Sequence, residues 1–236
     1  MNSDFDVTKR RLRALVFAFA ACLSGFAFGQ PEREDPEVRI IARETIEFQS
    51  VGSGTAELHL VAVRFAGGGW ERSTLVDAFR QSAAILAQCG MRLARVEFVL
   101  VDAPHRFQIY STLDAREFAR RMALPRPTVY FVRDTANQPA FDAEAIGRSN
   151  SRTRPELTDS VWVTRGTRDL GIALTHELMH LLMDSGAHIE TEGNLMRAET
   201  APENTLLDPD QCAQGMRNGK RNGLVQRSYY CPYYCQ

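Results

Sequence analysis

The sequence predicts a single α+β or α/β domain, in which a sheet packs against one long helix and a second helix follows. The predicted elements run strand, helix, strand, strand, strand, helix, with no internal repeat or low-complexity tract. The composition, with 44% hydrophobic and 24% charged residues, is that of a globular protein with a sizeable core. A length of 236 residues fits one such domain and a targeting segment.

Alternation of β-branched and apolar residues predicts the strands, and apolar residues at helical spacing predict the helices. Ser73 is the expected N-cap of the first helix, and Cys89 and Gly90 are expected to end it. Residues 134–156, rich in Asn, Ser, Arg and Pro, predict an extended or looping region. The other elements expected outside the second helix are strands at 57–65, 95–101, 128–133 and 160–164, a short helix near 114–122 and a terminal helix at 207–217.

The second helix is expected from about residue 170 to 183, with Thr167 or Asp169 as its cap. Three leucines share one face at i, i+4 and i+7, namely Leu174, Leu178 and Leu181. His176 and His180 each follow one of these leucines by two residues, so each is rotated by about 200° from the apolar stripe. Both imidazoles are therefore expected to project together, away from the core.

His176 and His180 lie one helical turn apart, a spacing at which two neutral imidazoles converge on one cation. Zinc suits nitrogen ligands held in tetrahedral geometry. Glu177, beside the first histidine, is placed to act as a general base that takes a proton from a zinc-bound water. The plainer alternative is a pair of surface histidines on an amphipathic helix.

A catalytic zinc site needs three protein ligands and an open position for water. Asp184, Ser185 and Gly186 are expected to end the helix, with Gly186 in the left-handed turn that reverses the chain. His188 follows this turn and is the expected third ligand. Outside such a site, a lone histidine in a loop is expected to be solvent-exposed.

A downstream carboxylate is the alternative third ligand. Four glutamates lie within reach: Glu190, Glu192, Glu199 and Glu203. The last two have helical spacing, but Pro202 and Pro209 disfavour a long ligand-bearing helix in this segment. We therefore expect these carboxylates to be solvated loop residues.

The motif residues resemble the metzincin superfamily of zinc peptidases. The resemblance covers about residues 160–196 and is carried by His-Glu-Leu-Met-His at 176–180, by His188, and by Asn-Leu-Met at 194–196. It implies an α+β zincin domain with a twisted mixed sheet, a long core helix and an active-site helix.

The resemblance also implies roles for residues around the motif. Met196 resembles the methionine of a turn beneath the metal, although a core methionine has the same appearance in the sequence. The strand at 160–164 would be the sheet edge that binds peptide. The chain departs from the family pattern at two points, because Met183 stands where the family has a glycine and His188 follows His180 by eight residues instead of six.

The first residues indicate export. Four basic residues precede an apolar stretch at 14–28, namely Lys9, Arg10, Arg11 and Arg13. Ala27 and Gly29 fit the small-residue places of a cleavage site before Gln30. A membrane anchor and a lipid-modified Cys22 are the alternatives, but the apolar run is shorter than the about 20 residues of a span.

Four cysteines remain after removal of the signal peptide: Cys89, Cys212, Cys231 and Cys235. In an exported chain this number favours two disulfides, for which three pairings exist. Because Cys231 and Cys235 lie close in sequence, we expect them to pair locally, which leaves Cys89 to pair with Cys212. Buried free thiols are the alternative.

We interpret the chain as a signal peptide at 1–29, an N-terminal extension at 30–56, a zinc metallopeptidase domain at 57–217 and a Cys- and Tyr-rich tail at 218–236. The expected function is that of a periplasmic or extracellular, monomeric zinc endopeptidase with one zinc ion and a peptide or protein substrate. The chain has 28 Lys and Arg residues and 29 Asp and Glu residues, so its net charge indicates neither nucleic acid nor anionic lipid as a partner. The alternative is an exported zinc-containing binding or assembly protein without peptidase turnover.

Overall fold

The computed structural model describes residues 37–48, 56–149 and 151–227, and within them the chain forms an α+β fold with a twisted mixed sheet and four α-helices. The strands are β1 (Arg39–Glu47), β2 (Ala56–Phe65), β3 (Met91–Asp102), β4 (Ile109–Tyr110), β5 (Thr128–Phe131), β6 (Asp134–Thr135), β7 (Ala143–Ile146), β8 (Ser160–Val163) and β9 (Val225–Arg227). The helices are α1 (Arg72–Leu86), α2 (Thr112–Met122), α3 (Leu170–Met183) and α4 (Pro209–Arg221), with 3-10 turns at Ala87–Cys89, His105–Gln108 and Pro155–Leu157. The predicted signal peptide, Cys22, Cys231 and Cys235 lie outside the described residues.

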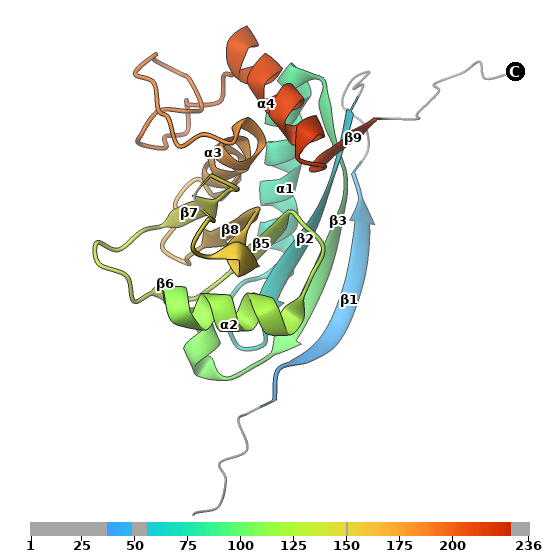
Figure 1. The fold of residues 1–236 in the computed structure, drawn as a ribbon, viewed down its shortest axis with the longest axis vertical. Helices are drawn as coiled ribbons and strands as arrows, with labels where there is room; N and C mark the ends of the chain where they lie inside the picture. Colours follow the sequence, from blue (N-terminus) through green and yellow to red (C-terminus); the bar gives the residue numbers. More distant parts are fainter. Residues whose placement is uncertain (1–36, 49–55, 150, 228–236) are drawn as a thin grey trace, which may run out of the picture. The chain divides into compact units, whose positions relative to one another are not determined.

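The large sheet has the strand order β1-β3-β2-β5-β8-β7, and β9 pairs with the start of β2 (Figure 1). Strands β3, β2, β5 and β8 are parallel, whereas β1 and β7 are antiparallel additions at the two ends. The expectation that the strand at 160–164 forms the edge is wrong, because β8 lies between β5 and β7. The edge strand β7 has four residues inside a segment whose composition predicted a loop, so no alternation revealed it.

Strand β1 pairs with β3 from Arg39 opposite Asp102 to Glu47 opposite Arg95. Most of its residues are exposed, so the strand lacks the apolar alternation that would have predicted it within residues 30–56. At the other end of the domain, α4 continues to Arg221 and is followed by β9. The sheet and its helices therefore include segments on both sides of residues 57–217.

Helices α1, α3 and α4 lie on one side of the large sheet and α2 lies on the other (Figure 1). Side chains of β2 alternate between the two sides, as the pleat of a strand requires. Leu60 and Ala62 belong to the core shared with α1 and α3, whereas Val61 and Val63 belong to the core shared with α2. This alternation confirms the predicted strand at 57–65 and explains why that strand was visible in the sequence.

The limits and caps of the helices can be compared with those that the sequence predicts. Helix α3 has the predicted limits, and Asp169 occupies its N-cap position in a left-handed conformation without a side-chain capping bond. Glu71 is the N-cap of α1, so the expected cap at Ser73 is wrong. Gly90 ends the following 3-10 turn with φ 65°, as expected of a glycine. Asp208 caps α4 as part of a capping box.

Helices α1 and α3 pack closely because Gly171 has no side chain. A Cβ atom at Gly171 would lie 2.7 Å from Cβ of Gln81 and 3.0 Å from the backbone oxygen of Ala78. Two buried hydroxyls add a polar link across the same crossing, since Thr175 donates to Ser82 at 2.9 Å. The crossing fixes α3 against the domain core, one turn before its first histidine.

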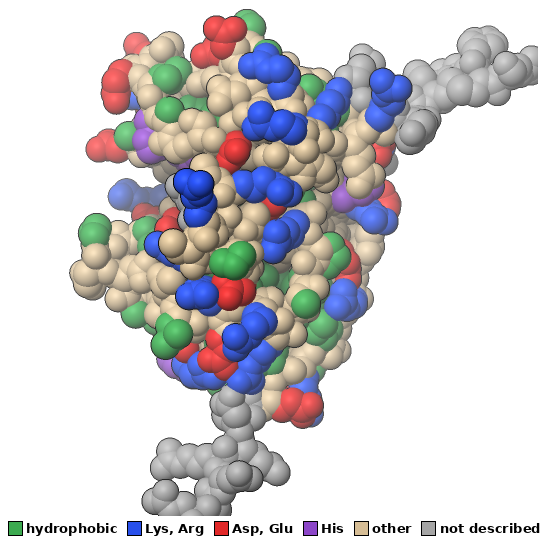
Figure 2. All heavy atoms as spheres, in the orientation of Figure 1, with side chains coloured by type: hydrophobic (Ala, Val, Ile, Leu, Met, Phe, Trp, Pro, Cys, Tyr) green, Lys and Arg blue, Asp and Glu red, His purple; other side chains and the backbone are tan. Residues whose placement is uncertain are grey.

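Several charged side chains of α2 form ion pairs with residues before and after the helix. Arg106 lies 2.7 Å from Glu117 and Arg116 lies 3.0 Å from Glu156. The Arg106 guanidinium holds the pKa of Glu117 below its usual value. Lys and Arg side chains are prominent on the face shown in Figure 2, with Asp and Glu among them. Because partly exposed pairs at a protein surface contribute about 0–1 kcal/mol each, they stabilise the fold little.

Among the described helices, none combines the length and the apolar character that crossing a membrane requires.

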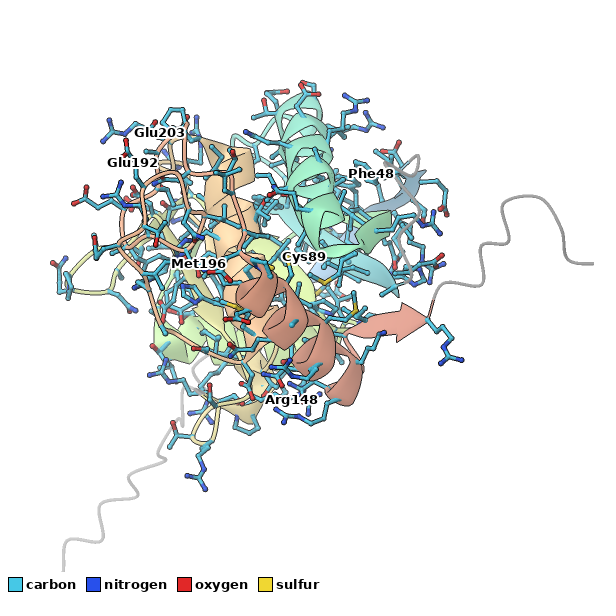
Figure 3. All side chains as sticks on the ribbon, turned by 90° about the horizontal axis from the view of Figure 1, so that it is seen from above. Phe48, Cys89, Arg148, Glu192, Met196 and Glu203 are labelled. Atoms are coloured by element: carbon cyan, nitrogen blue, oxygen red, sulfur yellow. A yellow bond between two sulfur atoms is a disulfide. The ribbon has the colours of Figure 1, made fainter. Side chains whose placement is uncertain are left out.

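A disulfide between Cys89 and Cys212 joins the 3-10 turn after α1 to the first turn of α4, which confirms that predicted pairing (Figure 3). The bond closes a loop with a sequence separation of 123 residues. We expect replacement of both cysteines by serine to lower the free energy of unfolding by about 2–5 kcal/mol, because the unfolded chain regains the freedom of that loop. Urea unfolding of the variant and the parent measures the difference.

A reducing agent supplies the control for this prediction. It should lower the stability of the parent to that of the double variant and leave the variant unchanged. Equal stability of parent and variant under oxidising conditions would show that the bond does not stabilise the fold.

Candidate metal centre

Helix α3 carries the buried His176 and the partly exposed Glu177 and His180. Most of the helix is buried, and His176 is only 3% exposed. The two imidazoles project together on the side of a cleft, as the spacing predicts, whereas the three leucines of the other face pack in the core. His176 is buried because the chain after the helix folds back over it, where a backbone hydrogen bond from Ile189 N to Met196 O, at 3.0 Å, closes a loop.

The reversal after α3 brings His188 to the two helical histidines. Asp184 ends the helix in the left-handed conformation with φ 50°, so the expectation that Gly186 makes this turn is wrong. Aspartate is among the few side chains that adopt this conformation readily. The Ser185 backbone N–H then donates to the His180 carbonyl at 3.2 Å, which continues the turn.

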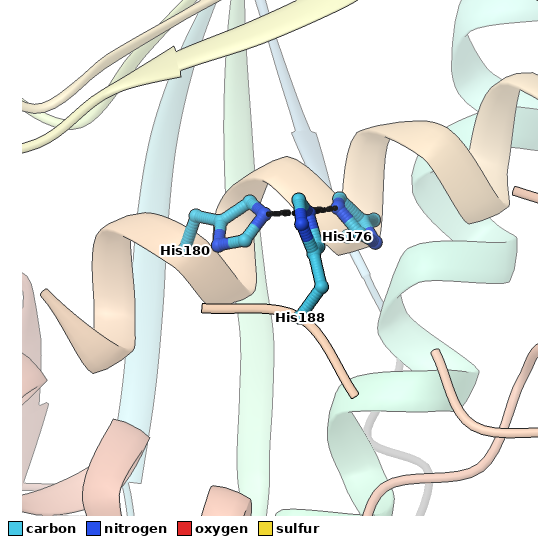
Figure 4. A group of neighbouring side chains, drawn as sticks. All are labelled: His176, His180 and His188. Atoms are coloured by element: carbon cyan, nitrogen blue, oxygen red, sulfur yellow. Dashed lines mark hydrogen bonds between the residues drawn. The ribbon is translucent and has the colours of Figure 1, made fainter. Parts of the chain in front are cut away.

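The Nε2 atoms of the three histidines converge on one point (Figure 4). They lie 2.9 Å apart for His176 and His180, 3.1 Å for His180 and His188, and 3.3 Å for His176 and His188. The other ring nitrogen, Nδ1, lies 2.7 Å from the Leu195 oxygen in His176 and 2.7 Å from the Ser185 oxygen in His180. A carbonyl oxygen only accepts, so both Nδ1 atoms carry the proton and both Nε2 atoms have a free lone pair when the rings are neutral.

Burial favours the neutral form of His176 and His180. It lowers the pKa of His176, and it lowers the pKa of His180 to about 4, with the neighbouring imidazoles acting in the same direction. Lone pairs facing one another repel unless a cation lies between them. A tetrahedral zinc ion with bonds of about 2.0–2.1 Å separates its ligand atoms by about 3.3 Å, which fits this arrangement.

This cluster is the only group of three or more His, Cys, Asp or Glu side chains arranged to hold a metal within residues 37–48, 56–149 and 151–227. The four glutamates considered as alternative ligands are exposed and lie outside it: Glu190, Glu192, Glu199 and Glu203. Figure 3 shows Glu192 and Glu203 on the outer part of the loop, while Met196 lies deeper. The geometry therefore favours His188 over a carboxylate as third ligand, although the spacing from His180 is long.

Glu177 lies beside the cluster and faces the edge of the sheet. Its carboxylate accepts a hydrogen bond from the backbone N–H of Ala145 in β7. Burial is the main cause that raises its pKa to about 8, and the nearby Glu144 carboxylate acts in the same direction. A cation bound to the histidines would favour the ionised carboxylate instead.

Two hollows of about 510 and 380 Å³ meet at the cluster. Both are lined by Ala143 of β7, by His176 and Glu177, and by Ala198 of the loop after the cluster. The larger hollow continues toward the start of α3, and the smaller one passes His180 and His188. The histidines thus lie at the middle of a cleft whose rim is β7.

The Asn-Leu-Met turn at 194–196 packs beneath His176. Met196 is fully buried in the main core, and its role as a Met-turn residue stays a prediction. The turn supplies the backbone oxygen of Leu195, which binds His176 Nδ1. A pattern of side chains in the sequence could not predict this contact, because the acceptor belongs to the backbone. Gln211 also contacts this turn. The spacing of Asp208 and Gln211 is typical of a capping box, so the sequence contained a signal that Gln211 lies in the first turn of α4.

Comparison with known proteins finds no matching family model and no matching curated protein. Among solved structures the chain is similar to metalloproteinase-II from Bacteroides fragilis, with 16% sequence identity and a TM-score of 0.48. The similarity covers 73% of this chain and 56% of that one. The chain thus spans little more than half of the length of that protein.

We expect the purified protein to contain about one equivalent of a divalent metal per chain, and the His188→Ala variant to lose it or bind it much more weakly. Three imidazoles are needed to surround the cation, and two leave its coordination incomplete. Elemental analysis after gel filtration measures the content. The Glu190→Ala variant is the matched control and should retain the metal. If Glu190→Ala loses the metal and His188→Ala retains it, the third ligand is the Glu190 carboxylate and not His188.

Proposed function

We propose that this chain is an exported zinc-dependent endopeptidase of the metzincin type, with His176, His180 and His188 as zinc ligands and Glu177 as general base. The observation that carries the proposal is the convergence of the three Nε2 atoms within 3.3 Å of one another. Three neutral imidazoles with no carboxylate or thiolate among them suit zinc better than magnesium or calcium. They leave a fourth position for water.

Zinc held there would act as a Lewis acid that lowers the pKa of a coordinated water and polarises the scissile carbonyl. The chain's own residues do the rest. Glu177 lines both hollows of the cleft, so its carboxylate can accept the proton of the attacking water. The same carboxyl group then delivers that proton to the nitrogen of the departing amine.

The edge strand β7 supports a peptide as substrate. Among the described strands, β7 has β8 as its only neighbour, so one edge is open to pairing. An extended peptide added along that edge would gain backbone hydrogen bonds regardless of its side chains. It would pass directly over Glu177, because Ala145 of β7 already binds that carboxylate.

Export rests on two observations. The basic and apolar pattern of residues 1–29 is typical of a signal peptide. The Cys89–Cys212 disulfide is typical of proteins in oxidising compartments. We propose a periplasmic or extracellular monomer that acts on peptides or proteins.

Replacement of Glu177 by Gln tests the enzymatic role. The amide cannot accept the water proton, so kcat/KM for a peptide library should fall by about 10²–10⁴-fold while zinc content stays at the parent level. Mass spectrometry of the products and elemental analysis of the protein measure the two quantities. Cleavage by the variant at the parent rate would refute the assignment of Glu177.

A chelator distinguishes the peptidase from a zinc-containing binding or assembly protein. Metal removal should abolish cleavage by the parent, and added zinc should restore it. A parent protein that binds zinc but cleaves no member of the library, with the chelator changing only the melting temperature, would favour the binding protein.

A further inference from the structure

The orientation of His176 depends on a single backbone carbonyl. Its Nδ1–H donates to Leu195 O at 2.7 Å, and this bond fixes both the tautomer and the rotation of the ring. A shift of the carbonyl would turn Nε2 away from the other two imidazoles. Whatever holds the 194–196 turn therefore also determines the placement of a metal ligand.

Asn194 holds this turn from within. Its side chain is 4% exposed, and Oδ1 accepts a hydrogen bond from the Met196 backbone N–H at 2.8 Å. The Leu195 backbone N–H donates to Leu206 O at 2.7 Å on the other side. The peptide group that contains the Leu195 carbonyl and the peptide group before it are thus each tied by a hydrogen bond.

Gln211 of α4 holds Asn194 in turn. The two amides exchange hydrogen bonds, with Asn194 Nδ2 donating to Gln211 Oε1 and Gln211 Nε2 donating to Asn194 Oδ1, each at 3.0 Å. Gln211 Oε1 also accepts from Asp208 N at 2.9 Å, and Gln211 N donates to Asp208 Oδ1 at 2.7 Å. Buried amides that exchange hydrogen bonds in this way favour one geometry, because any other leaves these polar groups unpaired.

We propose that Asn194 and Gln211 are positioning residues for the metal centre, which aim His176 at the metal through the Leu195 carbonyl. The inference rests on the proposed zinc site and adds a role for α4, which otherwise only covers α3. The Cys89–Cys212 disulfide anchors the same helical turn, one residue after Gln211. The metal ligand is thereby connected, through two side-chain amides, to a covalently fixed part of the fold.

The test replaces Gln211 by Met, which has a similar length but no amide. Gln214→Met is the matched control, since Gln214 lies on the same helix and donates one amide hydrogen bond to Met183 O at 3.0 Å. The zinc Kd by chelator competition and the melting temperature of the metal-free protein are measured for both variants. We expect both to melt earlier, but only Gln211→Met to bind zinc more weakly, by about 10–100-fold, as is typical when a partner behind a metal ligand is removed.

Equal zinc affinity in the two variants would overturn the inference. If Gln211→Met does not fold, Gln211→Glu replaces it, because the carboxylate keeps the length and the acceptor oxygens but puts a charged acceptor in place of the donor to Asn194 Oδ1. It should weaken zinc binding relative to the control in the same way, and unchanged affinity would again overturn the inference. The parent protein distinguishes failure of the proposed function from failure of this inference. A parent that binds no zinc refutes the proposed function itself. If the parent binds zinc and cleaves peptides while Gln211→Met retains its zinc affinity, only the positioning role is refuted.

Discussion

Three imidazole nitrogens held within 3.3 Å of one another are the constraint on which the rest of the structure depends. Two of them present free lone pairs, because their Nδ1 atoms already donate to carbonyl oxygens. These lone pairs repel one another. Burial lowers the pKa of both rings and so disfavours the protonated form that could donate a hydrogen bond between them. A cation bound between the nitrogens would accept their lone pairs, and the surrounding structure holds the nitrogens close enough to bind it.

Each of the three histidines is held by contacts of its own. His176 is oriented from behind by Leu195 O, and His180 by Ser185 O. His188 comes from a loop that the left-handed Asp184 turns back over the helix. The helix itself is fixed against α1 at the close crossing of Gly171, and α4 clamps the 194–196 turn. The histidines of the helix and the histidine of its return loop thus share one support.

The sequence predicted those parts of the site that depend on local spacing. Helix α3 has the limits expected at 170–183, and the three histidines meet although His188 comes eight residues after His180. Local spacing did not reveal the burial of His176, because the chain that covers it returns from further along the sequence. Strand β7 was hidden by its four-residue length, and β1 by its exposed, charged surface. The Asn194–Gln211 pair joins residues 17 positions apart, and no periodicity links them.

X-ray absorption spectroscopy at the zinc edge of the purified, metal-loaded protein identifies the atoms that surround the metal. Coordination by the three histidines predicts a first shell of three imidazole nitrogens and one further light atom at about 2.0–2.1 Å, with the multiple scattering that histidine rings produce. A sulfur shell at about 2.3 Å, or a shell of oxygens without imidazole scattering, would contradict it.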